Sequence, residues 1–167
     1  MPANDHPEHD GPPNRTVLLC TGLLRRAGRV LLVASRYPNQ PDPLWNLPGG
    51  RARDGELLAD ALVREWREEV DLAAEPGALL YASESFDRAT ATRFVNVTFA
   101  VRADGEPRVT TRDPHVVDVA WVPDADLAER VRVHVVREPL VAHLSGDARR
   151  YYAYADAGIT IAFADDP

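Results

Sequence analysis

The sequence over residues 50–72, GRARDGELLADALVREWREEVDL, restricts the fold of this chain more than any other segment. Leu58, Leu62, Trp66 and Val70 recur every four residues, the spacing of one face of an α-helix. This pattern predicts a helix over residues 57–70. Its apolar stripe is expected to pack against the core, with Trp66 as a packing residue.

The opposite face of this predicted helix carries a cluster of carboxylates. Glu65, Glu68 and Glu69 are three and four residues apart, so their side chains project to one side. Like charges at such spacings destabilise a helix by roughly 0.2–0.5 kcal/mol per pair, and a bound cation removes that penalty. Carboxylate oxygens suit Mg²⁺ or Mn²⁺. Arg64, one turn before Glu68, is expected to hold that carboxylate in one rotamer.

A solvated helix face with ion pairs would also explain this charged run if it stood alone. Two further features favour a metal site. Glu56 stands at a fixed spacing before the run, and Gly49 and Gly50 form a turn where the backbone can approach a phosphate closely.

The full spacing resembles the Nudix box, the signature of the Nudix hydrolase family. Gly50 is followed by five residues and Glu56, then by seven residues and the run from Arg64 to Glu69, with Leu72 as the apolar close. One specified position departs, because Asp71 stands where the family has glycine. The tetrad over residues 47–50, LPGG, precedes the box as it typically does in the family.

The resemblance implies an α/β fold, a Nudix-type α/β/α sandwich with a mixed β-sheet. It also implies a Mg²⁺-dependent (or Mn²⁺-dependent) hydrolase that cleaves the diphosphate linkage of a nucleoside di- or triphosphate or another nucleoside diphosphate derivative. The alternative is a non-catalytic nucleotide-binding Nudix module, a class that usually loses carboxylates of the box, whereas this chain keeps them. The implied metal ligands are Glu65, Glu69, Glu68 and Glu56, and the implied catalytic residues are Glu68, Glu65 and Arg64.

The general base stays open between Glu65, Glu68 and a residue outside the box. Some relatives place a glutamate in the loop before a strand that contains a tryptophan. The corresponding loop here has no glutamate, so Asp113 or His115 would have to replace it. A loop histidine can act as a base near neutral pH, but an ordinary surface histidine is the favoured explanation of His115.

Candidate phosphate-binding residues flank the box. Arg36 follows a predicted strand, in a region where relatives often carry a phosphate-binding arginine, and a guanidinium matches phosphate oxygens well. An ordinary surface arginine explains Arg36 equally. Arg51, Gly49 and Gly50 are the other predicted substrate-binding residues. Four aromatic residues on predicted strands can either stack on a base or fill the core: Trp45, Tyr81, Phe86 and Phe94.

The two ends of the predicted helix depart from the usual capping residues. Leu57 stands where a capping Ser or Thr is expected. Asp71 stands where glycine usually adopts the left-handed conformation, at a cost of roughly 1–2 kcal/mol for a residue with a side chain. These departures predict a structural effect that leaves the carboxylates intact.

Length and composition bound the remaining organisation. The 167 residues predict a disordered tail over residues 1–15 and a single domain over residues 16–167. The net charge of −7 argues against nucleic-acid polymers as partners. The single cysteine, Cys20, and the lack of any apolar run of about 20 residues predict a cytoplasmic protein without a membrane span. Many relatives form dimers, so a homodimer is compatible with the resemblance.

Apolar alternation and turn residues place the other elements. Strands are predicted over residues 16–24, 30–35, 44–47, 78–86, 93–102, 116–122 and 159–163, and helices over residues 124–130 and 138–144. The run over residues 149–154, RRYYAY, is expected to pack a terminal segment rather than line a nucleotide pocket.

Overall fold

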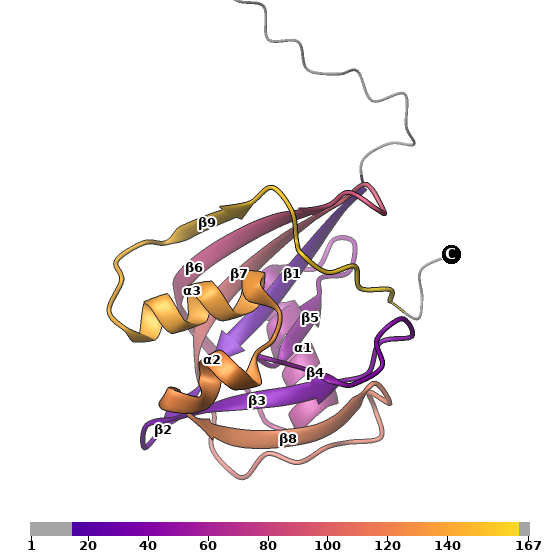
Figure 1. Cartoon of the computed structure of the whole chain (residues 1–167). Helices are drawn as coiled ribbons and strands as arrows, with labels where there is room; N and C mark the ends of the chain where they lie inside the picture. The colour runs from indigo at the N-terminus through magenta and orange to yellow at the C-terminus, as the bar shows by residue number, and fades with distance from the viewer. Residues whose placement is uncertain (1–14, 164–167) are drawn as a thin grey trace, which may run out of the picture.

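The computed structural model describes residues 15–163 (Figure 1). Its helices are the 13-residue α1 (Leu58–Val70), the 3₁₀ turn η1 (Asp124–Asp126), the short α2 (Leu127–Arg130) and α3 (His134–Leu144). The strands are β1 (Arg15–Leu23), β2 (Arg25–Arg26), β3 (Arg29–Ser35), β4 (Leu44–Asn46), β5 (Gly49–Arg51), β6 (Glu75–Asp87), β7 (Thr92–Arg102), β8 (Val116–Pro123) and β9 (Tyr151–Tyr154).

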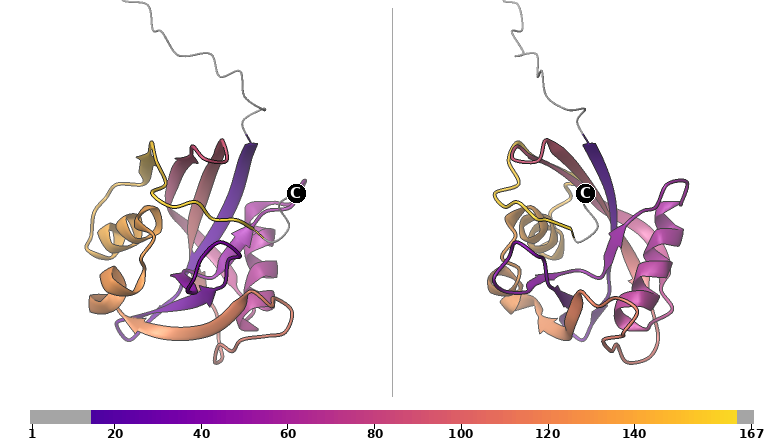
Figure 2. Two further views of the ribbon diagram at one scale, coloured as in Figure 1. Left: turned by 45° about the vertical axis from the view of Figure 1, so that its right-hand side comes forward. Right: turned by 90° about the vertical axis from the view of Figure 1, so that its right-hand side faces the viewer.

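The strands form two sheets between two helical layers. The larger sheet has the order β5-β1-β7-β6-β9 and is mixed, because β1 pairs parallel with β7 and β6 pairs parallel with β9. In the smaller sheet, β3 lies between β4 and β8 and also pairs with β2. Helix α1 covers one side of the strands and α2 and α3 cover the other (Figure 2). The predicted α/β/α sandwich with a mixed sheet is confirmed.

Strand β3 supplies side chains to both cores, which explains its continuous apolar sequence. Leu31 and Val33 point into the core around α1. Val30 and Leu32, on the alternate face, point into the core with α2 and α3. Successive side chains of a strand point to opposite faces, so one buried strand can join two helical layers.

Three of the four predicted stripe residues of α1, Leu62, Trp66 and Val70, are buried, and Leu58 is partly buried against them. Trp66 is fully buried and its indole N–H donates to the Pro48 carbonyl at 3.1 Å. The thiol of Cys20 is buried as well. Both ends of the helix show the expected departures: Leu57 makes no side-chain cap, and Asp71 has a left-handed φ of 56°.

One strand prediction is wrong. Residues 159–163 form no strand and contribute side chains to the lining of a cavity instead. The last strand is β9, which is formed by residues of the RRYYAY run (149–154). It extends the large sheet beside β6. Residues 159–163 do show the apolar alternation of a strand. Their apolar side chains line the cavity, but their backbone pairs with no neighbouring strand.

The predicted tail over residues 1–15 falls outside the described residues, except for Arg15, the first residue of β1. Within residues 15–163, every helix is too short or too polar to cross a membrane.

Candidate active site

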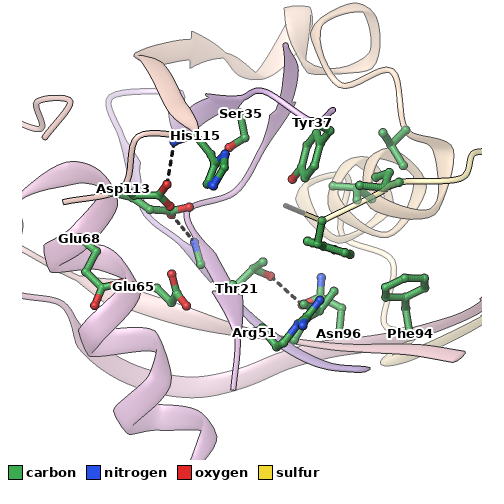
Figure 3. A pocket seen from close by; sticks show the side chains of 18 of the residues that line it. Thr21, Ser35, Tyr37, Arg51, Glu65, Glu68, Phe94, Asn96, Asp113 and His115 are labelled. Carbon is green, nitrogen blue, oxygen red and sulfur yellow. Dashed lines mark hydrogen bonds between the residues drawn. The ribbon is translucent and has the colours of Figure 1, made fainter. Parts of the chain in front are cut away.

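A cavity of about 560 Å³ lies between α1, the large sheet and the segment that follows β9. Its floor is one face of the sheet, because Leu19 and Thr21 on β1 and Phe94 and Asn96 on β7 alternate toward it. Charged residues gather at one end of the cavity and apolar residues at the other, and Figure 3 shows this division.

Three carboxylates meet at the charged end. Glu65 and Glu69 come from α1 and Asp113 from the loop before β8, and each offers an oxygen within 4.8 Å of the other two. Glu69 is only 5% exposed and Glu65 only 9%. Oxygen atoms that converge in this way suit Mg²⁺ or Mn²⁺, so the residues present fit the predicted ion.

The surroundings of the two helix carboxylates disfavour their charged forms. Burial is the main factor that raises the pKa of Glu69 well above its ordinary range, and the nearby charge of Glu65 adds to it. Burial likewise raises the pKa of Glu65, against the opposing effect of Arg64. A divalent cation would offset both effects, which is the physical reason to place one here.

The two glycines before the box shape the pocket for these carboxylates. Gly49 has φ of +144° and donates its N–H to Glu69 at 2.8 Å. A Cβ on Gly49 would lie 2.1 Å from the Cys20 carbonyl oxygen. A Cβ on Gly50 would lie 2.7 Å from the carboxyl carbon of Glu65. Both positions therefore require glycine to keep β5 close to β1 and to α1.

Arg64 joins three carboxylates around the site. Its guanidinium donates to both oxygens of Glu56 at 2.9 Å and to Glu65 at 2.7 Å. Its contact with Glu68, the partner expected from helical spacing, is longer at 3.4 Å. Arg64 therefore positions Glu65 chiefly, and Glu56 anchors Arg64.

Glu56 lies outside both the group of three carboxylates and the cavity lining. The hydrogen bonds from Arg64 and from the Arg53 backbone N–H lower the pKa of Glu56 to about 2. Its two oxygens are already engaged by those donors. The geometry thus favours an anchoring role over the predicted role as metal ligand.

The loop that carries Asp113 is attached to the C-terminal end of α1. Asp71 accepts hydrogen bonds from both Arg108 and Arg112. Arg112 also donates to the Arg67 carbonyl at 2.8 Å, and the Thr110 hydroxyl donates to the carbonyl of Glu68. These contacts satisfy carbonyl groups that a helix end leaves open. The contacts of Arg112 also restrain the loop next to Asp113.

His115 and Arg36 both line the cavity near this loop. The His115 backbone N–H donates to Asp113 at 2.9 Å, and its carbonyl accepts from the Arg36 backbone N–H at 2.8 Å. The loop is thereby tied to the end of β3. Glu68 also faces the cavity, with its side chain 30% exposed and Arg53 3.7 Å away.

The far end of the cavity is apolar and aromatic. The rings of Tyr37 and Phe163 meet edge to face at 5.9 Å, and Phe94 lies 6.1 Å from Phe163. The predicted phosphate-binding residue Arg51 stacks over the Phe163 ring at 4.7 Å. Sequence reasoning missed Phe163 and its neighbours as site residues. Their apolar alternation was visible and led to the incorrect strand prediction.

Comparison with known proteins extends this description. A family model described as NUDIX domain matches residues 13–144. The 8-oxo-dGDP phosphatase NUDT18 of Homo sapiens is 34% identical over 92 residues, which are 54% of this chain and 27% of the human protein. Its counterpart from Mus musculus is 35% identical over 94 residues, 55% of this chain and 28% of the mouse protein. The chain thus spans little more than a quarter of these relatives.

Solved structures show the same fold. A MutT NUDIX hydrolase from Burkholderia pseudomallei superposes with a TM-score of 0.65 and 29% identity, covering 75% of this chain and 96% of that one. A NUDIX hydrolase from Nitrosomonas europaea gives a TM-score of 0.69 at 20% identity over 82% and 93% of the two chains, a similarity of fold alone. The family match covers most of the chain and includes helix α1 with Glu65, Glu68 and Glu69, so this protein belongs to the Nudix hydrolase family.

Proposed function

We propose that the protein is a Mg²⁺- or Mn²⁺-dependent pyrophosphohydrolase that cleaves the diphosphate linkage of a nucleoside di- or triphosphate. The convergence of Glu65, Glu69 and Asp113 within 4.8 Å at the charged end of a nucleotide-sized cavity carries this proposal. A binding module without catalysis has no need to keep three buried or half-buried carboxylates together.

Glu65, Glu69 and Asp113 would hold the divalent ion, which supplies charge stabilisation for the phosphoryl oxygens and lowers the pKa of bound water. Gly49 orients Glu69 through its N–H, and Arg64 orients Glu65. Arginines that line the cavity complement the negative charge of the substrate phosphates. Besides Arg64 they are Arg36, Arg53 and Arg112, while Arg51 lies at the aromatic end over the Phe163 ring.

Glu68 is the group we assign to accept the proton of the attacking water. It faces the cavity beside the three carboxylates, and it is more exposed than Glu65 or Glu69. A base needs access to water and a free lone pair, whereas Glu65 and Glu69 are committed to the ion.

His115 is then a loop residue rather than the base. Its backbone, not its ring, makes the contacts with Asp113 and Arg36. We expect His115→Ala to lower kcat by less than about tenfold across pH 6–9, because general-base loss typically costs more, roughly 10²–10⁴-fold. A larger loss in the steady-state pH profile, together with loss of its acidic limb, would assign the base to His115.

The substrate class is inferred from the cavity and from the relatives. The charged end suits a diphosphate and the aromatic end a base. The name of the NUDT18 relatives adds oxidised guanine nucleoside diphosphates to the panel of substrates worth testing first.

A product-release screen over nucleoside di- and triphosphates tests the proposal, with Mg²⁺, with Mn²⁺ and with a chelator. We expect metal-dependent release of phosphate or diphosphate by the parent protein, and its loss in folded Glu65→Gln and Glu69→Gln variants. Nucleotide binding without turnover under any metal condition would instead favour a sensor.

A further inference from the structure

Residues 157–163, here named the C-terminal strap, lie outside the residues that the family model matches and contribute to the lining of the cavity. After β9 the chain leaves the edge of the large sheet and runs over to the loop before β4 (Figures 1 and 2). Part of the cavity lining therefore comes from a segment beyond the residues that the family model matches.

Hydrogen bonds attach the strap to the two sides of the cavity. On one side, the Ala157 N–H donates to the Phe86 carbonyl at 3.3 Å and the Thr160 hydroxyl donates to Asp87 at 3.2 Å. Asp87 is only 4% exposed, whereas Thr160 is half-buried, so this contact lies at the edge of the buried region.

On the other side, Asn39 and Gln40 hold the strap from the loop before β4. Their amide groups donate to the Thr160 carbonyl at 2.6 and 3.0 Å. The side-chain oxygen of Asn39 also accepts from the Ala162 N–H at 2.9 Å. Contacts from both sides fix the position of the strap in the structure.

The strap presents one apolar face to the cavity. Ile159, Ile161 and Phe163 line it, whereas the intervening Thr160 and Ala162 make the attaching hydrogen bonds. Alternate residues of an extended chain point to opposite sides, which accounts for this division of roles.

Aromatic and polar groups complete this end of the cavity. Phe163 meets Tyr37 and Phe94, so three ring systems border the space. On the floor, the Thr21 hydroxyl donates to the side-chain oxygen of Asn96 at 3.3 Å, which leaves the Asn96 amide to donate to a ligand (Figure 3). A flat heterocycle with hydrogen-bond acceptors matches flat apolar walls beside an amide donor.

We infer that the C-terminal strap forms one wall of the nucleobase site, with Ile161 and Phe163 contacting the base while the phosphates lie at the carboxylate end. The inference rests on the proposed function for the direction of the nucleotide. It makes the strap, which lies outside the residues that the family model matches, a determinant of substrate binding.

The test compares two ligands that differ only in the nucleoside. Guanosine 5′-(α,β-methylene)diphosphate carries a base, methylenediphosphonate does not, and neither is cleaved at the bridge. Their affinities for the full chain with Mg²⁺ are measured by calorimetry. We expect Ile161→Ala and Phe163→Ala to weaken the nucleotide roughly tenfold, the effect typical of losing a base-stacking side chain, and to leave methylenediphosphonate within twofold.

Two control variants keep the test interpretable. Leu79→Ala removes an exposed apolar side chain of β6 outside the cavity, and both affinities should stay unchanged. Ile161→Leu keeps the apolar volume of the strap and should retain nucleotide affinity. Thermal melts verify that every variant is folded.

If the strap variants lost affinity for both ligands equally, or kept their affinity for the nucleotide, the inference would be overturned. So would a parent protein that binds the two ligands equally. Failure of the proposed function appears separately, as selective nucleotide binding without any turnover of cleavable substrates.

Discussion

Gly50 shows how a single missing side chain determines the geometry of the site. A Cβ at this position would lie 2.7 Å from the carboxyl carbon of Glu65, so Gly50→Ala must displace that carboxylate. We expect metal affinity and kcat/KM to fall roughly 10–100-fold, as when a residue that supports a metal ligand is lost, with little change in Tm. A metal titration of the variant measures this.

Gly77→Ala is the matched control for the change at Gly50. Its Cβ would meet the Ala100 carbonyl oxygen at 3.3 Å, a milder contact in β6 away from the cavity. The control should keep its metal affinity within twofold. Wild-type affinity in Gly50→Ala would show that Glu65 is free to move and that the close contact has no functional role.

Glu56 gives a prediction that depends on pH. Its pKa is lowered to about 2 by the hydrogen bonds from Arg64 and from the Arg53 backbone. The ionised form therefore stabilises the fold above pH 4.5, the ordinary value, and this contribution is lost as the pH falls toward 2. We expect Glu56→Gln to unfold at a lower urea concentration at pH 7, and the gap to wild type to close near pH 2.

The same substitution should reach the metal site through Arg64. Without Glu56, Arg64 can pair more fully with Glu65 and compete with the cation, so metal affinity should fall. Urea unfolding at a series of pH values, with metal titration at pH 7, measures both effects. A gap in urea midpoint that is equal at pH 7 and pH 2 would argue against the ion pair as its cause.

At the scale of elements, Asp71 links the C-terminal end of helix α1 to the loop that carries Asp113. Asp71→Gly restores the usual residue at a left-handed position, where φ is 56°, and removes exposed ion pairs that stabilise little. We therefore expect Tm to stay equal or rise. Metal affinity should fall about tenfold, because Arg108 and Arg112 lose their shared carboxylate partner and hold the loop beside Asp113 less firmly.

A double-mutant cycle with Asp113→Asn tests that route. If Asp71 acts through Asp113, then Asp71→Gly should have little further effect on metal affinity in the Asp113→Asn background. Additive losses would show that Asp71 affects the site by another path. Asp71→Asn, which keeps a side chain that tolerates the left-handed conformation, should give an intermediate metal affinity.

Elements differ in how far the sequence determined them. Helix α1 was predictable because the spacing of its apolar residues, the spacing of its carboxylates and the Nudix box pattern agree. Asp113 appeared only as a possible substitute for a missing glutamate, because its distance from Glu65 depends on the contacts of Asp71 and Arg112 across the fold. Residues 159–163 were misassigned because alternation specifies an apolar face and does not say what that face contacts.

For the whole molecule, the sandwich brings together groups that are far apart in the sequence. Helix α1 lies on one side of the sheets (Figure 2). Its Glu65 and Glu69 carboxylates meet Asp113 of the loop before β8. Burial there raises the pKa values of Glu65 and Glu69, so protons compete with a cation for these oxygens. The free energy of unfolding of the metal-free protein should therefore decline as the pH rises above 4.5 through the raised pKa values. Added metal should offset this decline.

The most direct test of the metal site is calorimetric titration of the full chain with Mn²⁺ at pH 7.5, comparing wild type with Glu69→Gln. Glu69 makes one hydrogen bond to Gly49 and otherwise faces the carboxylate group, so the amide should preserve the fold. The predicted result is saturable binding to wild type and at least about tenfold weaker binding to the variant. Equal Mn²⁺ affinity in the two proteins would contradict the account.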